Sequence, residues 1–586
     1  MSKTREQEEQ GKEDESQAPT TRRGAEALVE GLKQEGVDTM FGITGGAVMP
    51  VYDALYDDED INHVMMGHEQ GAAHAAEAYH SVTGRPGVCL ATSGPGATNL
   101  ITGLADADMD SRSIIAVTGQ VPTEMIGNDA FQETDMRGVS MPVTKHNYLV
   151  KDEDDVPDTV QEAFYVSNTG RPGPVVIDVP KDVSKNDTDA VRSELNIEGY
   201  SPNYEGHPGQ IKKAAEAIEE ANKPLIFAGG GVVMADAAEE LRELANENNV
   251  PVTTSLQGLG SFPEDNDLSV RMLGMHGTGC ANRAVTECDL LIGLGVRFDD
   301  RATGKIESFA PHAKVIHVDI DPAEISKNIH ADIPIVGDAK RVLADLNDEM
   351  RSHDAPDTED WRETLDEWEE KYPMEYEKDD EHLKPQHVIE SLDAKTPDDT
   401  IVCTGVGQHQ MWAAQWYEYK EPRTWISSGG LGTMGCGLPM TIGAKLAAPD
   451  TEVVCIDGDG SFLMTLQELS TAVREELDFT LVIINNYYMG MVRQWQELFS
   501  NERYAESELP HLPKFDKIAE AFGANGFRLE EPENVEEVLE EALEYDGPSV
   551  IDAVIDPNEN VFPMVPAGSG NDEFIMGKGT QGSRIS

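Results

Sequence analysis

Short apolar runs alternate along the chain with stretches in which apolar residues recur every three or four positions. The apolar runs have the length of buried strands, and the longer periodic stretches have the pattern of helices. In the first third, strands are predicted at residues 39–43, 63–66, 88–92, 114–118 and 175–179. Because strands that alternate with helices form parallel sheets covered on both faces, this part predicts a doubly wound α/β unit.

The same alternation recurs twice further along, so we predict three doubly wound parallel-sheet units, consistent with a length of 586 residues. Polar or charge-dense stretches separate them. The predicted organisation is a disordered acidic leader at 1–22, an N-terminal unit at 23–183, a linker at 184–208, a central unit at 209–345, a helical connector at 346–384, a C-terminal unit at 385–565 and a Gly-rich tail at 566–586. We expect the tail to be mobile unless it covers a site.

Two polar clusters in the third unit follow predicted strands. One apolar run ends in Asp457-Gly458-Asp459-Gly460-Ser461, the next ends in Asn485-Asn486, and a helical pattern lies between them. Such a strand–helix–strand unit places both clusters at the carboxyl edge of one sheet, where open α/β sheets bind ligands. The glycines free backbone N–H groups for a diphosphate, and Asp459 and Asn486 offer oxygen ligands for Mg²⁺. The pair of clusters resembles the thiamine diphosphate (ThDP) motif, which implies that the main-chain carbonyl of Tyr488 is a third metal ligand.

Glu69 is the candidate for activating this cofactor. ThDP becomes a nucleophile when C2 of its thiazolium loses a proton, and a carboxyl group at N1′ of the pyrimidine promotes that loss. Glu69 precedes an alanine-rich helix, where a low-dielectric wall would raise its pKa. A glutamate in the first turn of a helix is otherwise a common capping residue. The ThDP motif downstream favours the catalytic role.

Eleven motifs between residues 23 and 565 then occur in one order: HEQGAAHAAEAY, ATSGPGATN, TGQVP, DAFQE, RPGPVVIDVPKDV, LGMHG, GVRFDDRATGK, GVGQHQMWAAQ, SGGLGTMGCGLP, GDGSF and NNYYMGMVRQW. Together they resemble the family of acetolactate synthase (acetohydroxyacid synthase) catalytic subunits. The resemblance implies decarboxylation of pyruvate and transfer of the two-carbon fragment to pyruvate or 2-ketobutyrate. The products, 2-acetolactate and 2-aceto-2-hydroxybutyrate, begin branched-chain amino-acid synthesis.

The resemblance also implies roles for individual residues. Met434 would buttress the bent cofactor, and the carbonyl of Gly432 would hold its 4′-amino group. The ThDP site would comprise Val406, Gly407, Gln408, His409, Gly432, Met434, Gly458, Gly460, Ser461 and Met491. An FAD without a redox role would be held by Arg171, Gly229, Gly230, Gly231, Leu273, Gly274, Met275, His276, Gly295, Arg297, Asp299, Arg301, Asp319, Ile320, Gly337 and Asp338. His409 has an alternative role as a hydrogen-bonding residue at a helix start.

Other residues resemble those that meet the substrate in the family. Gln120, Phe131 and Lys181 match the substrate-channel positions. Lys181 and Arg493 could supply positive charge to a keto-acid carboxylate, although either could equally be a solvated surface cation. Trp495 would offer apolar area to the extra methyl group of 2-ketobutyrate; a core tryptophan is the alternative.

The charge of the chain is extreme: 45 basic against 109 acidic residues give −64. Nucleic acids and anionic membranes are therefore unfavourable partners. The acidic surface resembles that of proteins from salt-saturated cytoplasm, so we expect structure or activity to fail in dilute buffer. The six cysteines have no metal-ligand or disulfide spacing, and there is neither a signal peptide nor an apolar run of eighteen residues. We expect a cytoplasmic protein.

Two other functions remain open from the residues alone. One is a pyruvate oxidase or simple 2-keto acid decarboxylase on the same scaffold, and the other is an inactive paralogue kept as an assembly subunit. Cys436 and the two tyrosines Tyr487 and Tyr488 depart from common family residues near the cofactor. The resemblance further implies a homodimer or homotetramer, with the site between two chains, and a separate small regulatory subunit.

Overall fold

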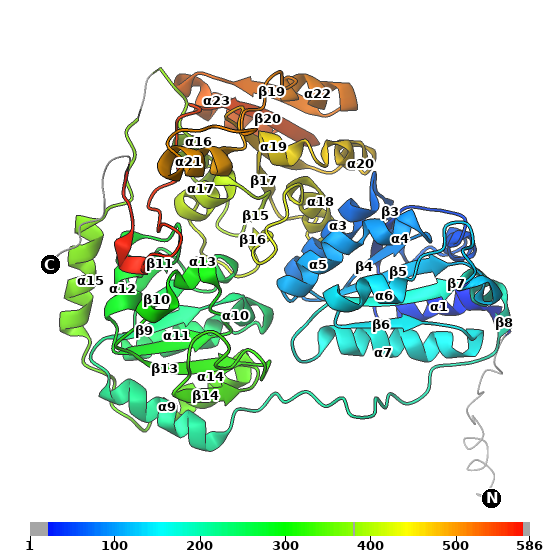
Figure 1. Cartoon of the computed structure of the whole chain (residues 1–586), viewed down its shortest axis with the longest axis horizontal. Helices are drawn as coiled ribbons and strands as arrows, with labels where there is room; N and C mark the ends of the chain where they lie inside the picture. The colour runs from blue at the N-terminus through cyan, green and yellow to red at the C-terminus, as the bar shows by residue number, and fades with distance from the viewer. Residues whose placement is uncertain (1–20, 379–380, 578–586) are drawn as a thin grey trace, which may run out of the picture.

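The computed structural model of the chain describes residues 21–378 and 381–577. It contains three six-stranded sheets, in each of which every neighbouring pair of strands is parallel. Helices cover the faces of the sheets (Figure 1). The predicted fold class, three doubly wound parallel-sheet units, is confirmed.

The N-terminal unit, blue to cyan in Figure 1, has the strand order β3-β2-β4-β5-β7-β6. Its strands are β2 Thr39–Gly42, β3 Asn62–Met65, β4 Gly87–Ala91, β5 Ile114–Gln120, β6 His146–Leu149 and β7 Val175–Pro180. Its helices are α1 Gly24–Gln34, α2 Met49–Tyr56, α3 Glu69–Thr83, α4 Pro95–Asn99, α5 Ile101–Met109, α6 Met136–Ser140, α7 Val156–Asn168 and α8 Lys181–Lys185. The edge strand β6 was missed because it is short and only half-buried, so it lacks an apolar run.

The central unit, green in Figure 1, has the order β11-β10-β9-β12-β13-β14. Its strands are β9 Pro224–Ala228, β10 Val252–Thr254, β11 Ser269–Met272, β12 Leu290–Leu294, β13 Lys314–Asp319 and β14 Ile333–Val336. Its helices are α9 Pro208–Glu220, α10 Gly230–Met234, α11 Ala238–Asn248, α12 Gly279–Glu287, α13 Asp300–Thr303 and α14 Ala339–Met350, followed by α15 Glu359–Lys371.

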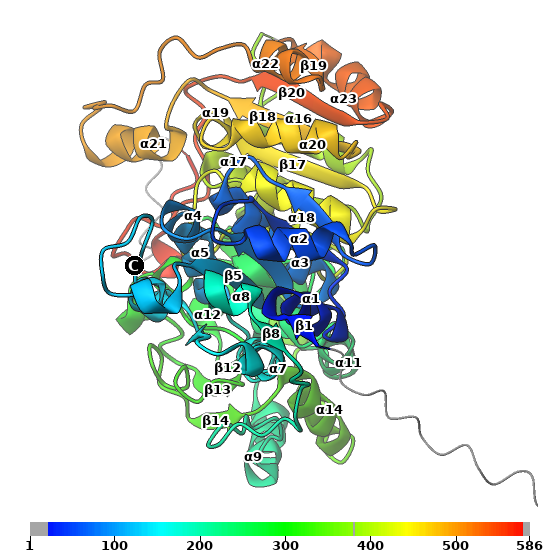
Figure 2. The same ribbon diagram turned by 90° about the vertical axis from the view of Figure 1, so that its right-hand side faces the viewer.

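The C-terminal unit, yellow to red, has the order β16-β15-β17-β18-β20-β19. Its strands are β15 Ile401–Thr404, β16 Trp425–Ile426, β17 Val453–Gly458, β18 Phe479–Asn485, β19 Asn525–Leu529 and β20 Pro548–Val554. Its helices are α16 Pro385–Asp393, α17 Gln408–Trp416, α18 Gly437–Ala447, α19 Asp459–Phe462, α20 Leu469–Arg474, α21 Gly490–Phe499, α22 Phe515–Phe522 and α23 Val535–Leu543. Helix α21 stands to one side of the sheet (Figure 2).

The segments between and around the units are more ordered than the sequence pattern suggests. Arg22 and Arg23 form a strand, β1, that pairs antiparallel with β8 (Asp187–Thr188). Leader residues 1–20 lie outside the described residues. Helix α14 crosses the boundary expected at residue 345, and Trp361 of α15 is buried and donates a hydrogen bond to the carbonyl of Pro224. The connector is therefore partly packed onto the central unit.

The tail expected after residue 566 packs against the central unit as far as residue 577. Phe574 is buried, and the amide of Asn571 donates to the carbonyl of Ala302. An antiparallel bridge between Met564 and Ile575 closes this segment. Apolar burial and backbone pairing therefore hold the tail in place as far as residue 577, and residues 578–586 lie outside the described residues.

The alanine-rich sequence of α3 is explained by its packing against α18. Buried alanines Ala72, Ala75 and Ala76 share one core with residues of the C-terminal unit. A Cβ added at Gly443 of α18 would lie 2.0 Å from the carbonyl oxygen of Ala75. Small residues on both helices thus allow the two backbones to approach closely, which docks the N-terminal unit onto the C-terminal unit.

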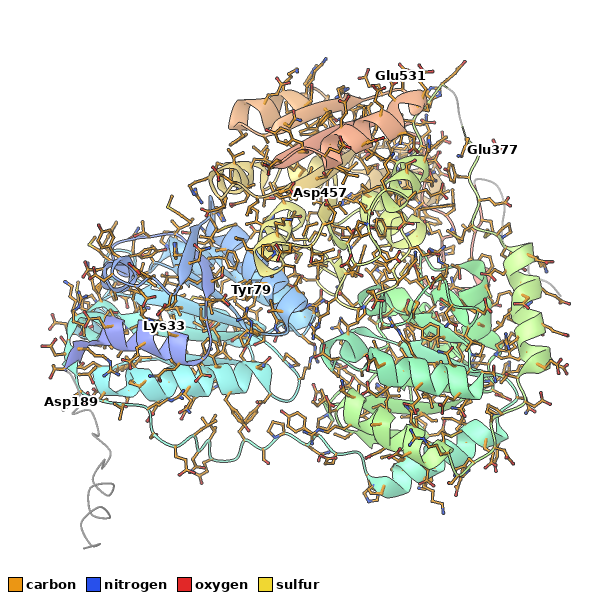
Figure 3. All side chains as sticks on the ribbon, turned by 180° about the vertical axis from the view of Figure 1, so that it is seen from behind. Lys33, Tyr79, Asp189, Glu377, Asp457 and Glu531 are labelled. Carbon is orange, nitrogen blue, oxygen red and sulfur yellow. The ribbon has the colours of Figure 1, made fainter. Side chains whose placement is uncertain are left out.

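Acidic residues occur both on the surface and in the interior. Asp189, Glu377 and Glu531 are exposed at the periphery of the molecule, whereas Asp457 lies inside the C-terminal unit (Figure 3). The six cysteines are all buried and free. Within the described part of the chain, no helix has both the length and the apolar character needed to cross a bilayer.

Candidate active site

A cavity of about 1080 Å³ lies where the three units meet. The C-terminal unit lines it with the residues that follow β15, β17 and β18, together with the loop 427–436 that leads from β16 to α18. The carboxyl ends of neighbouring parallel strands meet at one edge of a sheet, so both predicted polar clusters open into the same space.

The proposed metal ligands Asp459, Asn486 and Tyr488 all line this cavity. One oxygen of Asp459, Oδ1, accepts a hydrogen bond from the backbone N–H of Gly460 at 2.8 Å. The other, Oδ2, is buried and has no hydrogen-bond partner among the described residues. Burial raises the pKa of this carboxyl to about 7. A buried polar oxygen without a hydrogen-bond partner costs free energy of folding, which a bound ion would offset. Carboxylate and amide oxygens are also the ligands that Mg²⁺ prefers, so these residues fit the ion.

The diphosphate side is built by close backbone approach. A Cβ at Gly458 would lie 2.5 Å from Nδ1 of His409, and a Cβ at Gly490 would lie 2.0 Å from Oε1 of Gln408. That same Gln408 oxygen accepts a hydrogen bond from the side-chain amide of Asn486 at 3.0 Å. Burial lowers the pKa of His409 to about 3, so its imidazole is neutral. Glycine at positions 458 and 490 therefore allows the backbone to pack directly against the side chains of His409 and Gln408.

The expected ThDP residues surround the same space. The cavity is lined by Val406, Gly407, Gln408, His409, Gly432, Met434, Gly458, Gly460, Ser461 and Met491. Gly432 has φ +71°, a left-handed conformation that favours glycine. The methyl carbon of Met434 lies 3.8 Å from the Cβ position of Gly460. The loop that carries Met434 thus faces the Gly-Asp-Gly turn.

The central unit forms the other part of the cavity. Of the residues expected to hold FAD, those that line it are Arg171, Gly230, Gly231, Leu273, Met275, His276, Gly295, Arg297, Asp299, Arg301, Asp319, Ile320 and Asp338. Gly229, Gly274 and Gly337 do not line it. Gly229 packs tightly instead, since its Cβ would lie 2.2 Å from the carbonyl oxygen of Gly295. Arg171 is already paired with Glu324 at 2.8 Å.

Four expected residues of the N-terminal unit lie outside this cavity: Glu69, Gln120, Phe131 and Lys181. Glu69 is the first residue of α3 and accepts a hydrogen bond from the amide of Asn99 at 3.0 Å. Gln120 is buried and donates to Asp178, whereas Phe131 is 88% exposed. In a single chain the candidate activating carboxyl and the candidate metal site therefore do not share a cavity.

The two residues expected near the acceptor substrate differ in environment. Trp495 lines the cavity, and the guanidinium of Arg301 lies over its ring at 5.6 Å from the centroid. Arg493 does not line the cavity; it is buried and paired with Glu497 at 3.1 Å. Arg493 is therefore not a solvated surface cation, and a buried carboxylate already neutralises it, so its role toward a substrate stays a prediction. Arg301 is an exposed cation that the cavity does present.

Three residues depart from those common in the family, Cys436, Tyr487 and Tyr488, and each has a different environment. Cys436 is fully buried behind the loop, with its thiol 3.5 Å from the carbonyl of Thr404. Tyr487 has φ +61°, and its hydroxyl accepts a hydrogen bond from Arg528. Of the three, Tyr488 alone is among the residues that line the cavity.

Comparison with known protein families finds a match in each of the three units. Residues 22–139 match the thiamine pyrophosphate enzyme N-terminal TPP binding domain, residues 211–346 the central domain and residues 405–553 the C-terminal TPP binding domain. The chain is 50% identical over 566 residues to the acetolactate synthase of Mycobacterium bovis, covering 95% of this chain and 92% of the relative. The chain belongs to the acetolactate synthase large-subunit family. The resemblance drawn from the motifs is confirmed.

Other relatives in the family are similarly close. The acetolactate synthase large subunit of Corynebacterium glutamicum is 49% identical over 568 residues, 95% of this chain and 91% of the relative. That of Haemophilus influenzae is 45% identical over 564 residues, 95% of this chain and 98% of the relative. Family membership makes the chain a ThDP-dependent enzyme and favours acetolactate formation over the pyruvate oxidase alternative.

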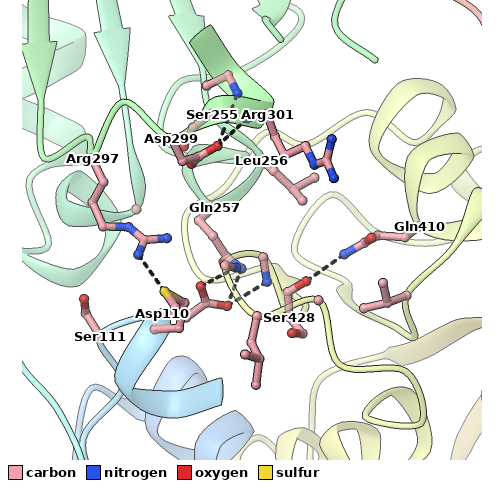
Figure 4. A pocket seen from close by; sticks show the side chains of 18 of the residues that line it. Asp110, Ser111, Ser255, Leu256, Gln257, Arg297, Asp299, Arg301, Gln410 and Ser428 are labelled. Atoms are coloured by element: carbon pink, nitrogen blue, oxygen red, sulfur yellow. Dashed lines mark hydrogen bonds between the residues drawn. The ribbon is translucent and has the colours of Figure 1, made fainter. Parts of the chain in front are cut away.

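Several residues at the centre of the site were not predicted. Asp110, Gln257, Gln410 and Ser428 line the cavity and face one another where the units meet (Figure 4). A signal was present in the sequence, because Asp106, Asp108 and Asp110 crowd the end of a helix, where the helix dipole disfavours negative charge. The hydrogen-bond partners of Asp106 and Asp110 lie in other units, so the local sequence pattern did not show which groups these side chains contact.

Proposed function

We propose that the chain is the catalytic subunit of an acetolactate synthase. It decarboxylates pyruvate and joins the two-carbon fragment to pyruvate or 2-ketobutyrate, which is the first common step of valine, leucine and isoleucine biosynthesis. The observation that carries the proposal is the single cavity in which Asp459 and Asn486, the Met434 loop and Trp495 come together. Family membership supports the same reaction.

ThDP, when bound, would supply a nucleophilic carbon and an electron sink for the decarboxylation of a 2-keto acid. Asp459, Asn486 and the carbonyl of Tyr488 would hold Mg²⁺ on its diphosphate, with Gly458, Gly460 and neighbouring N–H groups around the phosphates. Met434 would act as an apolar wedge beneath the bent cofactor, a role that suits a flexible side chain that does not titrate. Gly432 would accept a hydrogen bond from the 4′-amino group.

Glu69 would hold a proton at N1′ of the pyrimidine. Since it does not line the cavity of its own chain, we propose that the N-terminal unit of a second copy supplies it. Large apolar side chains near both half-sites are exposed, with Phe131 on the N-terminal unit and Leu431 and Met464 on the C-terminal unit. Their burial against a second copy would favour such an assembly. A homodimer is then the smallest active assembly, and a homotetramer is compatible with it.

The acceptor keto acid would meet the cavity beside Trp495. Arg301 stands over that ring and is exposed, so it can pair with the substrate carboxylate, the role first expected of Arg493. The methyl group of 2-ketobutyrate would pack on the indole, which favours the larger acceptor. Gln120, Phe131 and Lys181 would line the approach from the partner's N-terminal unit.

FAD would occupy the part of the cavity formed by the central unit. That region presents backbone at Gly230 and Gly231 and the side chain of Arg297, which suit phosphate groups. Because the carboligation has no net redox step, the flavin would have a structural role.

Relatives named large subunit support a separate small regulatory subunit as partner. The net charge of −64 disfavours nucleic acids and anionic membranes as partners, and we propose a cytoplasmic site of action.

The test is to incubate the purified protein with pyruvate alone and with pyruvate plus 2-ketobutyrate, omitting ThDP, Mg²⁺ and FAD in turn. Acetolactate as the main product, lost without ThDP or Mg²⁺, is the expected result. Acetyl phosphate, acetate or acetaldehyde as the main product would instead identify an oxidase or decarboxylase. Absence of any turnover with all three cofactors present would favour an inactive assembly subunit.

A further inference from the structure

The loop 427–436 carries two residues of the proposed site, Gly432 and Met434. Its own backbone restricts its conformation only weakly. It contains glycines at four positions, and Gly432 and Gly435 have positive φ. Glycine loses more conformational freedom on ordering than any other residue. A wedge that must be placed to within a fraction of an ångström therefore needs contacts from outside the loop.

Asp110, the residue that caps the end of α5, supplies the first of these contacts. Its Oδ1 accepts a hydrogen bond from the backbone N–H of Gly430, and its Oδ2 accepts one from Gly429, both at 2.7 Å. Asp110 is only 8% exposed. Charge-assisted hydrogen bonds to two successive N–H groups are short and strong, so this carboxylate fixes both the position and the orientation of the peptide.

Asp106, one helical turn earlier on α5, contacts the same loop through the side chain of Ser428. Its Oδ1 accepts from the hydroxyl of Ser428 at 2.5 Å, and that hydroxyl oxygen in turn accepts from the backbone N–H of Thr433 at 2.8 Å. The other carboxylate oxygen of Asp106 lies 3.5 Å from the buried His74. Two carboxylates at i and i+4 thus reach both ends of the glycine stretch.

Gln257 brings the central unit into the same cluster. Its amide nitrogen donates to Oδ2 of Asp110 at 3.1 Å and to the carbonyl of Ser427 at 2.7 Å (Figure 4). Its amide oxygen accepts from the buried guanidinium of Arg112 at 2.9 Å. A Cβ at Gly429 would lie 2.5 Å from the nitrogen of Gln257, so a larger residue there would displace the Gln257 amide from its hydrogen bonds.

We propose that Asp110 and Gln257 are positioning residues that hold the Met434 loop in its active conformation. The inference rests on the proposed function, since it assigns the loop to ThDP. Neither residue needs to touch the reacting atoms. They act through the backbone of Gly429 and Gly430, and all three units must dock correctly before the loop is held. Docking of the central unit thereby becomes a requirement for catalysis at the C-terminal unit.

The first test is Asp110→Asn. An amide cannot accept from both N–H groups, because its nitrogen is itself a donor, so Gly429 or Gly430 is released. A misplacement of about 1 Å costs on the order of 100-fold in rate, and we expect kcat for acetolactate to fall by about this factor. KM for pyruvate should stay within threefold, since the contacts to the substrate are elsewhere. The near-UV circular dichroism of bound ThDP, which reports the geometry of its pyrimidine, should change.

Gln257→Ala provides a second variant that removes only the contact from the central unit and leaves both carboxylates. It should lower kcat in the same way, with a smaller change in the dichroism signal, and it serves if Asp110→Asn fails to fold. The matched control is Asp398→Asn, which removes an exposed ion pair with Lys420. Thermal unfolding of all variants is measured beside activity.

Wild-type kcat and dichroism in Asp110→Asn or Gln257→Ala would overturn the proposal. So would a fall in kcat that only parallels a loss of folded protein. These outcomes are distinct from failure of the proposed function, which would show as absence of acetolactate from the unmodified enzyme.

Discussion

Replacing Trp495 with leucine tests how the site chooses between acceptors. Trp495 is half-buried, lines the cavity and carries the guanidinium of Arg301 over its ring. Leucine keeps the position apolar but removes the flat surface on which the extra methyl group of 2-ketobutyrate would pack. Loss of the cation–π contact, about 0.5–1 kcal/mol at an exposed site, affects both acceptors alike. It therefore cancels when the two products are compared.

The remaining difference is the contact of one carbon. Burying a CH₂ group contributes about 0.8 kcal/mol, equivalent to about a fourfold preference. A well-formed apolar pocket can reach about 3 kcal/mol, or roughly 150-fold. We therefore expect the ratio of 2-aceto-2-hydroxybutyrate to 2-acetolactate to fall at least about fourfold in Trp495→Leu, measured in mixtures of pyruvate and 2-ketobutyrate.

Trp368→Leu is the matched control. Trp368 is also half-buried, also has a guanidinium over its ring, that of Arg283 at 5.0 Å from the centroid, and does not line the cavity. This control should leave the product ratio unchanged. An unchanged ratio in Trp495→Leu, with total turnover retained, would refute the packing of the acceptor methyl group against the indole.

Four further results are expected. Glu69→Gln should lower kcat by about 100-fold or more, the usual contribution of a positioned acid or base, with ThDP affinity retained; turnover near wild type would remove Glu69 from the mechanism. Asp459→Asn, or treatment with a chelator, should abolish ThDP binding measured by calorimetry, and undiminished binding would argue against the metal site. Gly443→Ala should destabilise the protein by about 1–3 kcal/mol, because the new Cβ meets the carbonyl of Ala75 at 2.0 Å; an unchanged Tm would contradict this. Dialysis to dilute buffer should lower activity or reduce secondary structure, because salt screens the repulsion between acidic residues in a chain of charge −64. Full activity in dilute buffer would contradict this dependence on salt.

Much of the fold could be predicted from the alternation of apolar runs and helical periodicity. The strands with continuous apolar runs, such as β5 and β17, are fully buried in the structure and were located to within one or two residues. Two edge strands, β6 and β19, escaped because they are half-exposed: β19 buries only its last residue completely. The edge strand β3 was nevertheless predicted from its sequence. The packing of the connector and of the tail also escaped, since single buried residues such as Trp361 and Phe574 leave no periodic signal.

The sequence by itself determined the shared location of Asp459 and Asn486. Each ends a strand of the same βαβ unit, and neighbouring parallel strands always bring their carboxyl ends together. The motif order was likewise enough to identify the family.

Only the tertiary structure decided which other side chains face that edge. Glu69 lies outside the cavity of its own chain, Arg493 is neutralised by Glu497, and Asp110 holds Gly430 across 320 positions of sequence. Such contacts depend on how separate units dock, and docking is set by the sum of many small packing contacts that no local pattern encodes.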